Sequence, residues 1–383
     1  MAFGKKNVIK IDPLQYSITL LGESKCGKTT LIYEYCKRLA GEDGYLFIET
    51  GAERGADAIS GINYINAPCW NMDYDEYTNS AGFADICEDI IENKSTDYKD
   101  LRVVVIDTFD QLIDIAEDES IRLYNKELRE AGKPIIKSIN QAWSGFGRGE
   151  KKAMELMFNL RNRLLQVGVQ TIYISHVKKK DVTDVVSGET YQTLTSDQQQ
   201  NYFNALKKDM HFLALAYIDR EIIKENSGKK NNKGQEIKVG RVTGESRRIK
   251  FRDDNYAVDS GSRFAEIEPD IPMNVDAFID AITNAIKAEA EKGDKSINDL
   301  KKEQDKAAKK REKEIAEKEV ENRSKKELNN ILEQIKEYCN SAKEEKRLED
   351  VKPIVAKAKE LGYSSPMEID NIDDAKEVLS LCS

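Results

Sequence analysis

The sequence predicts an α/β fold, because short apolar segments alternate with helical patterns along most of the chain. An apolar segment at 16–21 leads through a glycine-containing turn into a helical pattern at 31–39. Two further apolar segments, 101–106 and 169–175, have the length and composition of buried strands, and each is followed by a polar residue. The functional residues are therefore expected near the ends of these strands.

The turn after the first strand fits G-x-x-x-x-G-K-[ST], the phosphate-binding P-loop. Its glycines let successive backbone N–H groups face a phosphate, and the following helix adds the positive end of its dipole. Lys28 is expected to reach the β- and γ-phosphates of ATP, and the Thr29 hydroxyl to bind Mg²⁺. A chance match in a turn is disfavoured, since strand, loop and helix follow in order. The expected nucleotide-binding residues are Gly22, Glu23, Ser24, Lys25, Cys26, Gly27, Lys28, Thr29 and Thr30.

The composition of the chain argues against several other classes of protein and of site. The chain has 383 residues, of which 39% are apolar and 34% charged, and no apolar run approaches the ~20 residues of a membrane span. No signal-like stretch follows Met1, so a cytoplasmic protein without membrane partners is expected. The six cysteines form no C-x-x-C pair, and only two histidines are present, which excludes a histidine-rich metal site. The net charge of −9 argues against a basic coat but allows a local basic groove.

The segment 101–106 ends at Asp107, which matches the Walker B pattern of an apolar strand closed by a Mg²⁺-binding acid. The alternative is that Asp107 only caps the helix expected near 109–130. In a chain with a P-loop, the metal role is favoured. A second strand at 44–48 precedes two candidate acids, Glu49 and Glu53.

The rest of the chain is predicted to contain a loop, a β-hairpin and C-terminal helices. Residues 181–205 read as a polar loop, and 218–258 as an antiparallel hairpin. Three domains are predicted: 1–270 as the nucleotide-binding domain, 271–326 as a docking helix with a charged helical spacer, and 327–383 as a small helical domain.

The order of these motifs resembles phage-encoded RecA-like P-loop ATPases of the single-strand annealing and recombination kind, over about residues 13–265. The P-loop carries most of this resemblance, and the other matches gain weight from their order. It implies a RecA-like core with a mostly parallel central sheet, here followed by a C-terminal helical extension. It also implies assembly into a homo-oligomer, either a ring or a filament.

The resemblance suggests further site residues. A glutamate after the inserted strand would activate water, and Glu53 is the first candidate with Glu49 close behind, although either acid could be an ordinary surface residue. His176, after the strand 169–175, would sense the γ-phosphate, or else is a satisfied histidine. Lys250 and Arg252 resemble a K-x-R pair that enters a neighbour's ATP site, and a surface ion pair is the alternative.

In such proteins the loop before the helix of 151–166 and the loop after the sensor strand bind DNA. Trp143 and Phe146 near the first loop could stack on bases, or could pack beneath it. The expected DNA-binding residues are Arg148, Lys151, Lys152, Lys178, Lys179 and Lys180.

The sequence therefore predicts an ATP-hydrolysing, Mg²⁺-dependent protein of DNA recombination or annealing that binds single-stranded DNA. The helical tail is expected to bind a single-strand-binding or replication protein. The rival hypothesis is a nucleotide-gated switch or scaffold that recruits such a partner without processing DNA. A small-molecule P-loop kinase ranks last, because the basic residues cluster in the two loops and the hairpin.

Overall fold

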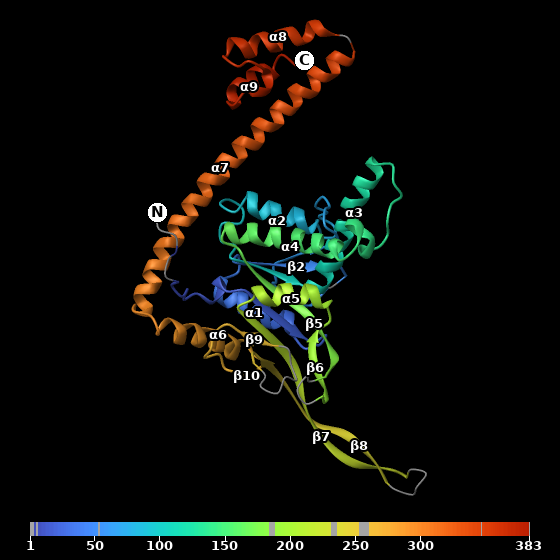
Figure 1. The fold of residues 1–383 in the computed structure, drawn as a ribbon. Coiled ribbons are helices and arrows are strands. Elements are labelled where there is room, and N and C mark those ends of the chain that lie inside the picture. Colours follow the sequence, from blue (N-terminus) through green and yellow to red (C-terminus); the bar gives the residue numbers. More distant parts are fainter. Residues whose placement is uncertain are drawn as a thin grey trace. The chain divides into compact units, whose positions relative to one another are not determined.

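A computed structural model describes residues 4, 7–52, 54–183, 188–230, 236–252, 260–345 and 347–382. The contacts within the chain divide it into two units, 1–91 with 98–306, and 92–97 with 307–383. The first unit holds the sheet, and the second is helical (Figure 1).

The described residues of the first unit form one large sheet with the strand order β10-β8-β7-β1-β5-β4-β2-β3. The pairs among β7, β1, β5, β4, β2 and β3 are parallel, and β8 and β10 add antiparallel strands at one side. β6 and β9 pair with β5 and β7 outside this order. The strands are β1 Ile18–Gly22, β2 Tyr45–Thr50, β3 Tyr64–Ala67, β4 Val103–Asp107, β5 Gln170–Thr183, β6 Thr190–Ser196, β7 Phe212–Lys230, β8 Glu236–Lys250, β9 Gly261–Ser262 and β10 Asp270–Pro272.

Helices cover both faces of this sheet, which explains why the central strands are apolar without alternation. Successive side chains of a strand point to opposite faces. Val103 and Val105 of β4 thus pack in the core beneath α1 and α6, whereas Val104 and Ile106 pack beneath α2, α3 and α4 (Figure 1). The helices of this unit are α1 Lys28–Ala40, α2 Phe83–Glu92, α3 Phe109–Glu130, α4 Arg148–Gln166, α5 Gln200–Asp209 and α6 Val275–Ala290, and α7 Ile297–Glu344 begins here.

The predicted fold class is confirmed in its architecture: the P-loop core has a mostly parallel central sheet, and helices follow it at the C-terminal end. The helix expected near 274–290 is α6, and it is part of the core of the first unit. Its Phe278 stacks on Phe251 with ring centroids 5.7 Å apart. The side chain of Asn274 caps the helix by accepting a hydrogen bond of 2.9 Å from the Ala277 N–H.

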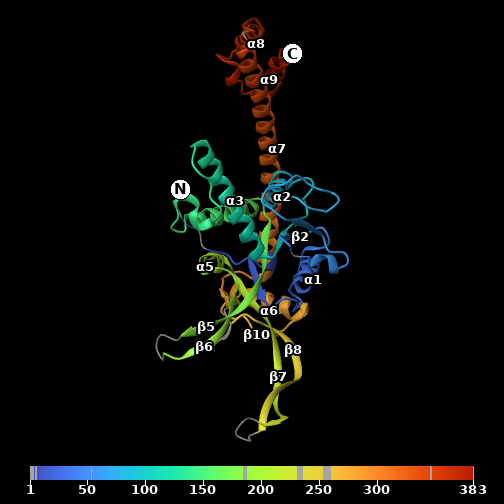
Figure 2. The ribbon, with the colours of Figure 1, turned by 90° about the vertical axis from the view of Figure 1, so that its right-hand side faces the viewer.

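The expected loop at 181–205 is wrong. β5 continues to Thr183 and pairs with β6 in an antiparallel hairpin, and α5 follows. β1 ends at Gly22, which lies opposite His176 of β5 and Ala216 of β7. Both neighbours continue beyond this level, so the β5–β6 and β7–β8 hairpins project from the carboxyl edge of the sheet (Figure 2).

The second unit contains most of α7, α8 Leu348–Glu360 and α9 Ile372–Leu379. α7 is one continuous helix of 48 residues, where the sequence suggested a spacer and a separate helix. Ile335, Ile354 and Val378 from the three helices form a small hydrophobic core. Further along α7, the buried carboxylate of Glu319 accepts hydrogen bonds of 2.9 and 3.0 Å from the backbone N–H of Ser95.

Candidate nucleotide site

The P-loop lies between the end of β1 and the start of α1, where the sequence predicts it. Gly27 has φ 104°, a left-handed conformation that favours glycine. A Cβ atom at Gly22 would lie 2.9 Å from the carbonyl oxygen of Ala216, so the neighbouring strand leaves no room for a side chain there. The two motif glycines are thus required by the backbone and by the packing of β7 against β1.

The Lys28 side chain is buried and lies along the loop. Its Nζ donates hydrogen bonds to the carbonyl oxygens of Gly22 at 3.1 Å and Glu23 at 2.9 Å. The ammonium group is therefore held at the mouth of the loop, where a phosphate oxygen can take the place of these carbonyls.

Thr29 and Asp107 meet although they are far apart in the chain. The Thr29 hydroxyl donates a hydrogen bond of 2.7 Å to Asp107 Oδ2, and Asp107 is buried at the end of β4. Both side chains offer oxygen atoms, which are the ligands that Mg²⁺ prefers. The pair fits the predicted metal site, with one protein oxygen from the P-loop motif and one from the end of β4.

Glu49 at the end of β2 lies beside Asp107, because β2 and β4 are parallel and place these residues opposite each other. Its Oε1 accepts a hydrogen bond of 2.5 Å from the Ala56 N–H, while its buried Oε2 has no hydrogen-bond partner among the described residues. A Cβ atom at Gly55 would lie 3.2 Å from Thr29 Oγ1 and 3.6 Å from Glu49 Oε1, which shows that the three residues adjoin.

Burial raises the pKa of Glu49 to about 7, and the nearby charges of Asp107 and Asp57 act in the same direction. A carboxyl group with a pKa near neutral is suited to accept a proton from water. Its unpartnered Oε2 provides an acceptor for a water molecule. Glu53, the first candidate of the sequence, lies outside the described residues.

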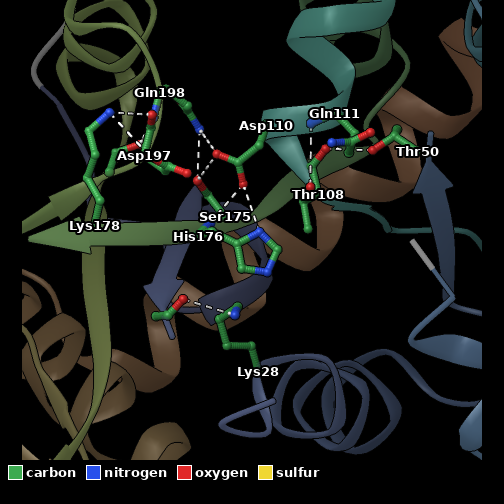
Figure 3. A network of polar contacts seen from close by, with 12 residues as sticks. Lys28, Thr50, Thr108, Asp110, Gln111, Ser175, His176, Lys178, Asp197 and Gln198 are labelled. Atoms are coloured by element: carbon green, nitrogen blue, oxygen red, sulfur yellow. Dashed lines mark hydrogen bonds and ion pairs between the residues drawn. The ribbon is translucent and has the colours of Figure 1, made fainter. Parts of the chain in front are cut away.

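His176 belongs to a polar network between the first turn of α3 and the middle of β5, just beyond the level at which β4 ends (Figure 3). Asp110, in the first turn of α3, accepts a hydrogen bond of 2.8 Å from the His176 backbone N–H, and its Oδ2 lies 3.3 Å from His176 Nδ1. Asp110 also accepts from the Ser175 hydroxyl at 2.9 Å and from Gln198 Nε2 at 3.1 Å. In Figure 3 the imidazole projects from β5 on the side of Lys28.

Burial alone would raise the pKa of Asp110, but the hydrogen bonds from His176, followed by those from Gln198 and Ser175, outweigh it and lower the pKa. The network therefore holds an ionised carboxylate behind the imidazole. The sequence analysis missed Asp110 and Gln198. Asp110 had a signal, since an acid three residues after Asp107 falls in the first turn of the next helix.

The first predicted DNA-binding segment is a strained turn before α4. Trp143, Ser144, Gly145, Phe146 and Gly147 all have positive φ angles. The Trp143 indole is held against α3, because its Nε1 donates a hydrogen bond of 3.1 Å to Ser120 Oγ. Trp143 is thus the residue that packs beneath the turn.

Phe146 in the same turn is 99% exposed, so its ring is available to a partner. Arg148 and Lys151 are exposed in the first turn of α4, whereas the Lys152 ammonium lies 5.5 Å from the centre of the Trp143 ring. This arrangement presents an aromatic ring beside two cations.

The second segment is placed differently from the prediction. Lys178, Lys179 and Lys180 are exposed but lie on β5 rather than in a loop, since β5 pairs with β6 at these positions. Lys178 Nζ donates a hydrogen bond of 2.7 Å to the carbonyl oxygen of Asp197. The three cations therefore belong to a regular hairpin, on which successive side chains point to opposite faces.

Lys250 and Arg252 do not lie on one strand, because β8 ends at Lys250. The Lys250 ammonium lies 5.5 Å from the centre of the Tyr217 ring. Arg252 donates hydrogen bonds of 2.9 Å to the carbonyl oxygens of Phe264 and Ala265. Both side chains have contacts within the chain, and their role in a neighbour's site stays a prediction.

No helix in the described part of the chain has both the length and the hydropathy needed to cross a membrane. No group of three or more His, Cys, Asp or Glu side chains suited to a metal ion occurs among the described residues. A Mg²⁺ ion held by Thr29 and Asp107 would therefore depend on phosphate and water for its other ligands.

Comparisons with known proteins match the part of the chain that contains this site. A family model described as an AAA domain matches residues 14–264. Among solved structures, the chain is similar to a KaiC-like protein of the archaeon Pyrococcus horikoshii, with 14% sequence identity and a TM-score of 0.32, over 65% of this chain and 87% of that one. The search of curated proteins finds no match.

Proposed function

The chain belongs to the AAA-domain family, and from this premise we propose that it hydrolyses ATP with Mg²⁺ and couples hydrolysis to an action on single-stranded DNA. The arrangement of Thr29, Asp107 and Glu49 around the P-loop carries the first part of the proposal. It supplies two metal ligands and an acceptor for a water proton within one site.

Each residue has a distinct task in this proposal. The backbone N–H groups of the P-loop and the Lys28 ammonium bind the phosphates. Thr29 and Asp107 orient Mg²⁺, which when bound neutralises phosphate charge. Glu49 orients the attacking water and accepts its proton, and the Asp110 carboxylate holds the His176 imidazole on the side of the γ-phosphate.

The DNA part of the proposal concerns recombination or annealing, and it rests on exposed cations near the ATP site. Lys178, Lys179 and Lys180 lie on β5 one residue after His176, the proposed sensor, so a change at the γ-phosphate has a short path to them. The exposed ring of Phe146 with Arg148 offers stacking and charge, as single-strand binding requires. Assembly of several copies into a ring or filament, and a phage origin, belong to the same proposal.

A second candidate function is a nucleotide-gated switch or scaffold that recruits a single-strand-binding or replication protein. The observation that favours it is the helical second unit, which has a hydrophobic core of its own built on Ile335, Ile354 and Val378. Such a unit can bind a partner without contributing to ATP chemistry.

Phosphate release with and without single-stranded DNA tests the proposal. We expect Mg²⁺-dependent release that DNA accelerates, and its loss in Lys28→Ala with an unchanged circular dichroism spectrum. Weak release that DNA does not change would favour the switch. Release that persists in Lys28→Ala would remove the P-loop from the mechanism.

A further inference from the structure

The nucleotide site has a basic residue that the sequence motifs do not include. Arg247 lies on β8, two strands away from β1 in the sheet. A Cβ atom at Gly27 would lie 3.6 Å from Arg247 Nη1, so the guanidinium reaches the P-loop of its own chain. Gly27 is the last loop residue before α1.

The register of the sheet explains this position. Gly22 lies opposite Ala216 of β7, and Ala216 lies opposite Ile249 of β8, so Ile249 is level with the end of β1. β8 runs antiparallel to β7, and Arg247 therefore lies opposite Ile218, two residues beyond that level on the P-loop side. Residues two apart share a strand face, and Ile249 packs in the core beneath α1. Arg247 therefore lies on the same strand face as Ile249, near the start of α1.

Two neighbouring cations on the hairpin form ion pairs within the described part of the chain. Arg248 pairs with Asp270 at 2.8 Å, and Arg220 lies 3.5 Å from Glu245 and 3.9 Å from Glu23. In the described part of the chain no carboxylate forms an ion pair with Arg247, and its side chain is exposed. An unpaired guanidinium beside a phosphate-binding loop is suited to bidentate contact with phosphate oxygens.

We propose that Arg247 binds the polyphosphate of the nucleotide held by the P-loop of the same chain. This inference rests on the proposed function, since it assigns a further ligand to that site. Lys28 acts from within the loop and Asp107 and Glu49 from β4 and β2, on one side of β1. Arg247 acts from β8, on the other side. The bound nucleotide would thus contact the base of the β7–β8 hairpin directly, through Arg247.

The test is the affinity for ATP and for ADP, measured by calorimetry with Mg²⁺ on the full chain. We expect Arg247→Ala to weaken both nucleotides about tenfold or more, as the loss of a charged hydrogen bond does. Arg247→Lys should retain part of the affinity because it keeps the charge. The matched control is Arg241→Ala, which removes an exposed arginine from the same strand and should leave the affinity unchanged.

The outcomes separate this inference from the proposed function. If the wild type fails to bind, or Lys28→Ala binds as tightly as the wild type, the P-loop function fails. If Lys28→Ala loses binding while Arg247→Ala matches the wild type, the Arg247 inference alone is overturned. Should Arg247→Ala melt well below the wild type, the comparison of Arg247→Lys with Arg247→Gln decides, and equal affinities would overturn the inference.

Mixing two variants tests whether Arg247 acts within its own chain. Lys28→Ala supplies an intact Arg247, and Arg247→Ala supplies an intact P-loop. If the contact is internal, the mixture should release phosphate no faster than the two variants measured separately. Recovery on mixing would place Arg247 in a neighbouring copy's site and overturn the assignment.

Discussion

The Thr29 hydroxyl donates a 2.7 Å hydrogen bond to Asp107 Oδ2, which joins the P-loop to the end of β4. We expect Asp107→Asn to weaken Mg²⁺ binding in the presence of ATP by about 10–100-fold, because a neutral amide replaces the carboxylate near the metal. Hydrolysis should fall accordingly. Titration of phosphate release against Mg²⁺ checks this, and an unchanged Mg²⁺ requirement would remove Asp107 from the metal site, since Thr108 and not Asp107 caps α3.

Glu49→Gln should bind ATP normally and hydrolyse it at least tenfold more slowly, because a glutamine cannot accept the proton of the attacking water. Glu53→Gln is the matched variant, since it makes the same change at the competing candidate. Single-turnover hydrolysis and ATP binding are measured for both. If only Glu53→Gln blocks hydrolysis, Glu53 is the base and Glu49 has a structural role.

The pH dependence of stability follows from the raised pKa of Glu49. The fold favours its neutral form, so its contribution to stability is fully present below about pH 4.5 and is lost as the pH rises through 7. Without nucleotide or Mg²⁺, Glu49→Gln should match the wild type at pH 4 and exceed it at pH 8 by up to about 3 kcal/mol. Urea unfolding at both pH values measures this. A difference that does not change with pH would contradict the raised pKa.

Binding of single-stranded DNA should depend on salt and be tighter with ATP. Each phosphate contact on a single strand releases about 0.7 counterion, so changing Lys178, Lys179 and Lys180 to Gln should lower the slope of log affinity against log salt by up to about 2. Fluorescence anisotropy of a labelled oligonucleotide provides the measurement.

The control for this experiment changes three exposed lysines of α7 to Gln: Lys302, Lys309 and Lys313. It should change the slope less. Equal slopes in the wild type and the β5 variant would place the DNA site elsewhere, and no binding at low salt with any nucleotide would remove the DNA proposal.

Shortening the chain after residue 306 should leave a folded, ATP-hydrolysing protein, whereas shortening it after residue 290 should lower its melting temperature. The second cut removes Leu300, which is buried with Ile11, and Gln304, whose side chain bonds to the backbone of Ile9 and Ile11 at 2.8 and 2.9 Å. Loss of a buried leucine typically costs about 2–5 kcal/mol. Thermal unfolding of the two shortened chains checks this, and equal melting temperatures would contradict it.

The P-loop and the strand that ends at Asp107 could be predicted from the sequence alone, because each is a contiguous segment whose residue types specify its local conformation. The sequence also predicted the alternation of strands and helices, and so the fold class. The polar segment 181–205 was misread, since β6 acquires its strand conformation by pairing with β5 rather than from an apolar pattern.

The acid beside Asp107 and the cation that reaches the P-loop became evident from the folded structure. Parallel pairing of β2 with β4 sets Glu49 against Asp107, and the register of β8 on β7 carries Arg247 to Gly27. Both depend on hydrogen bonds between strands distant in the chain, and a shift of one residue in either register would turn the side chain to the opposite face. Local sequence has no pattern that specifies such a register, which is why these residues emerged only from the folded chain.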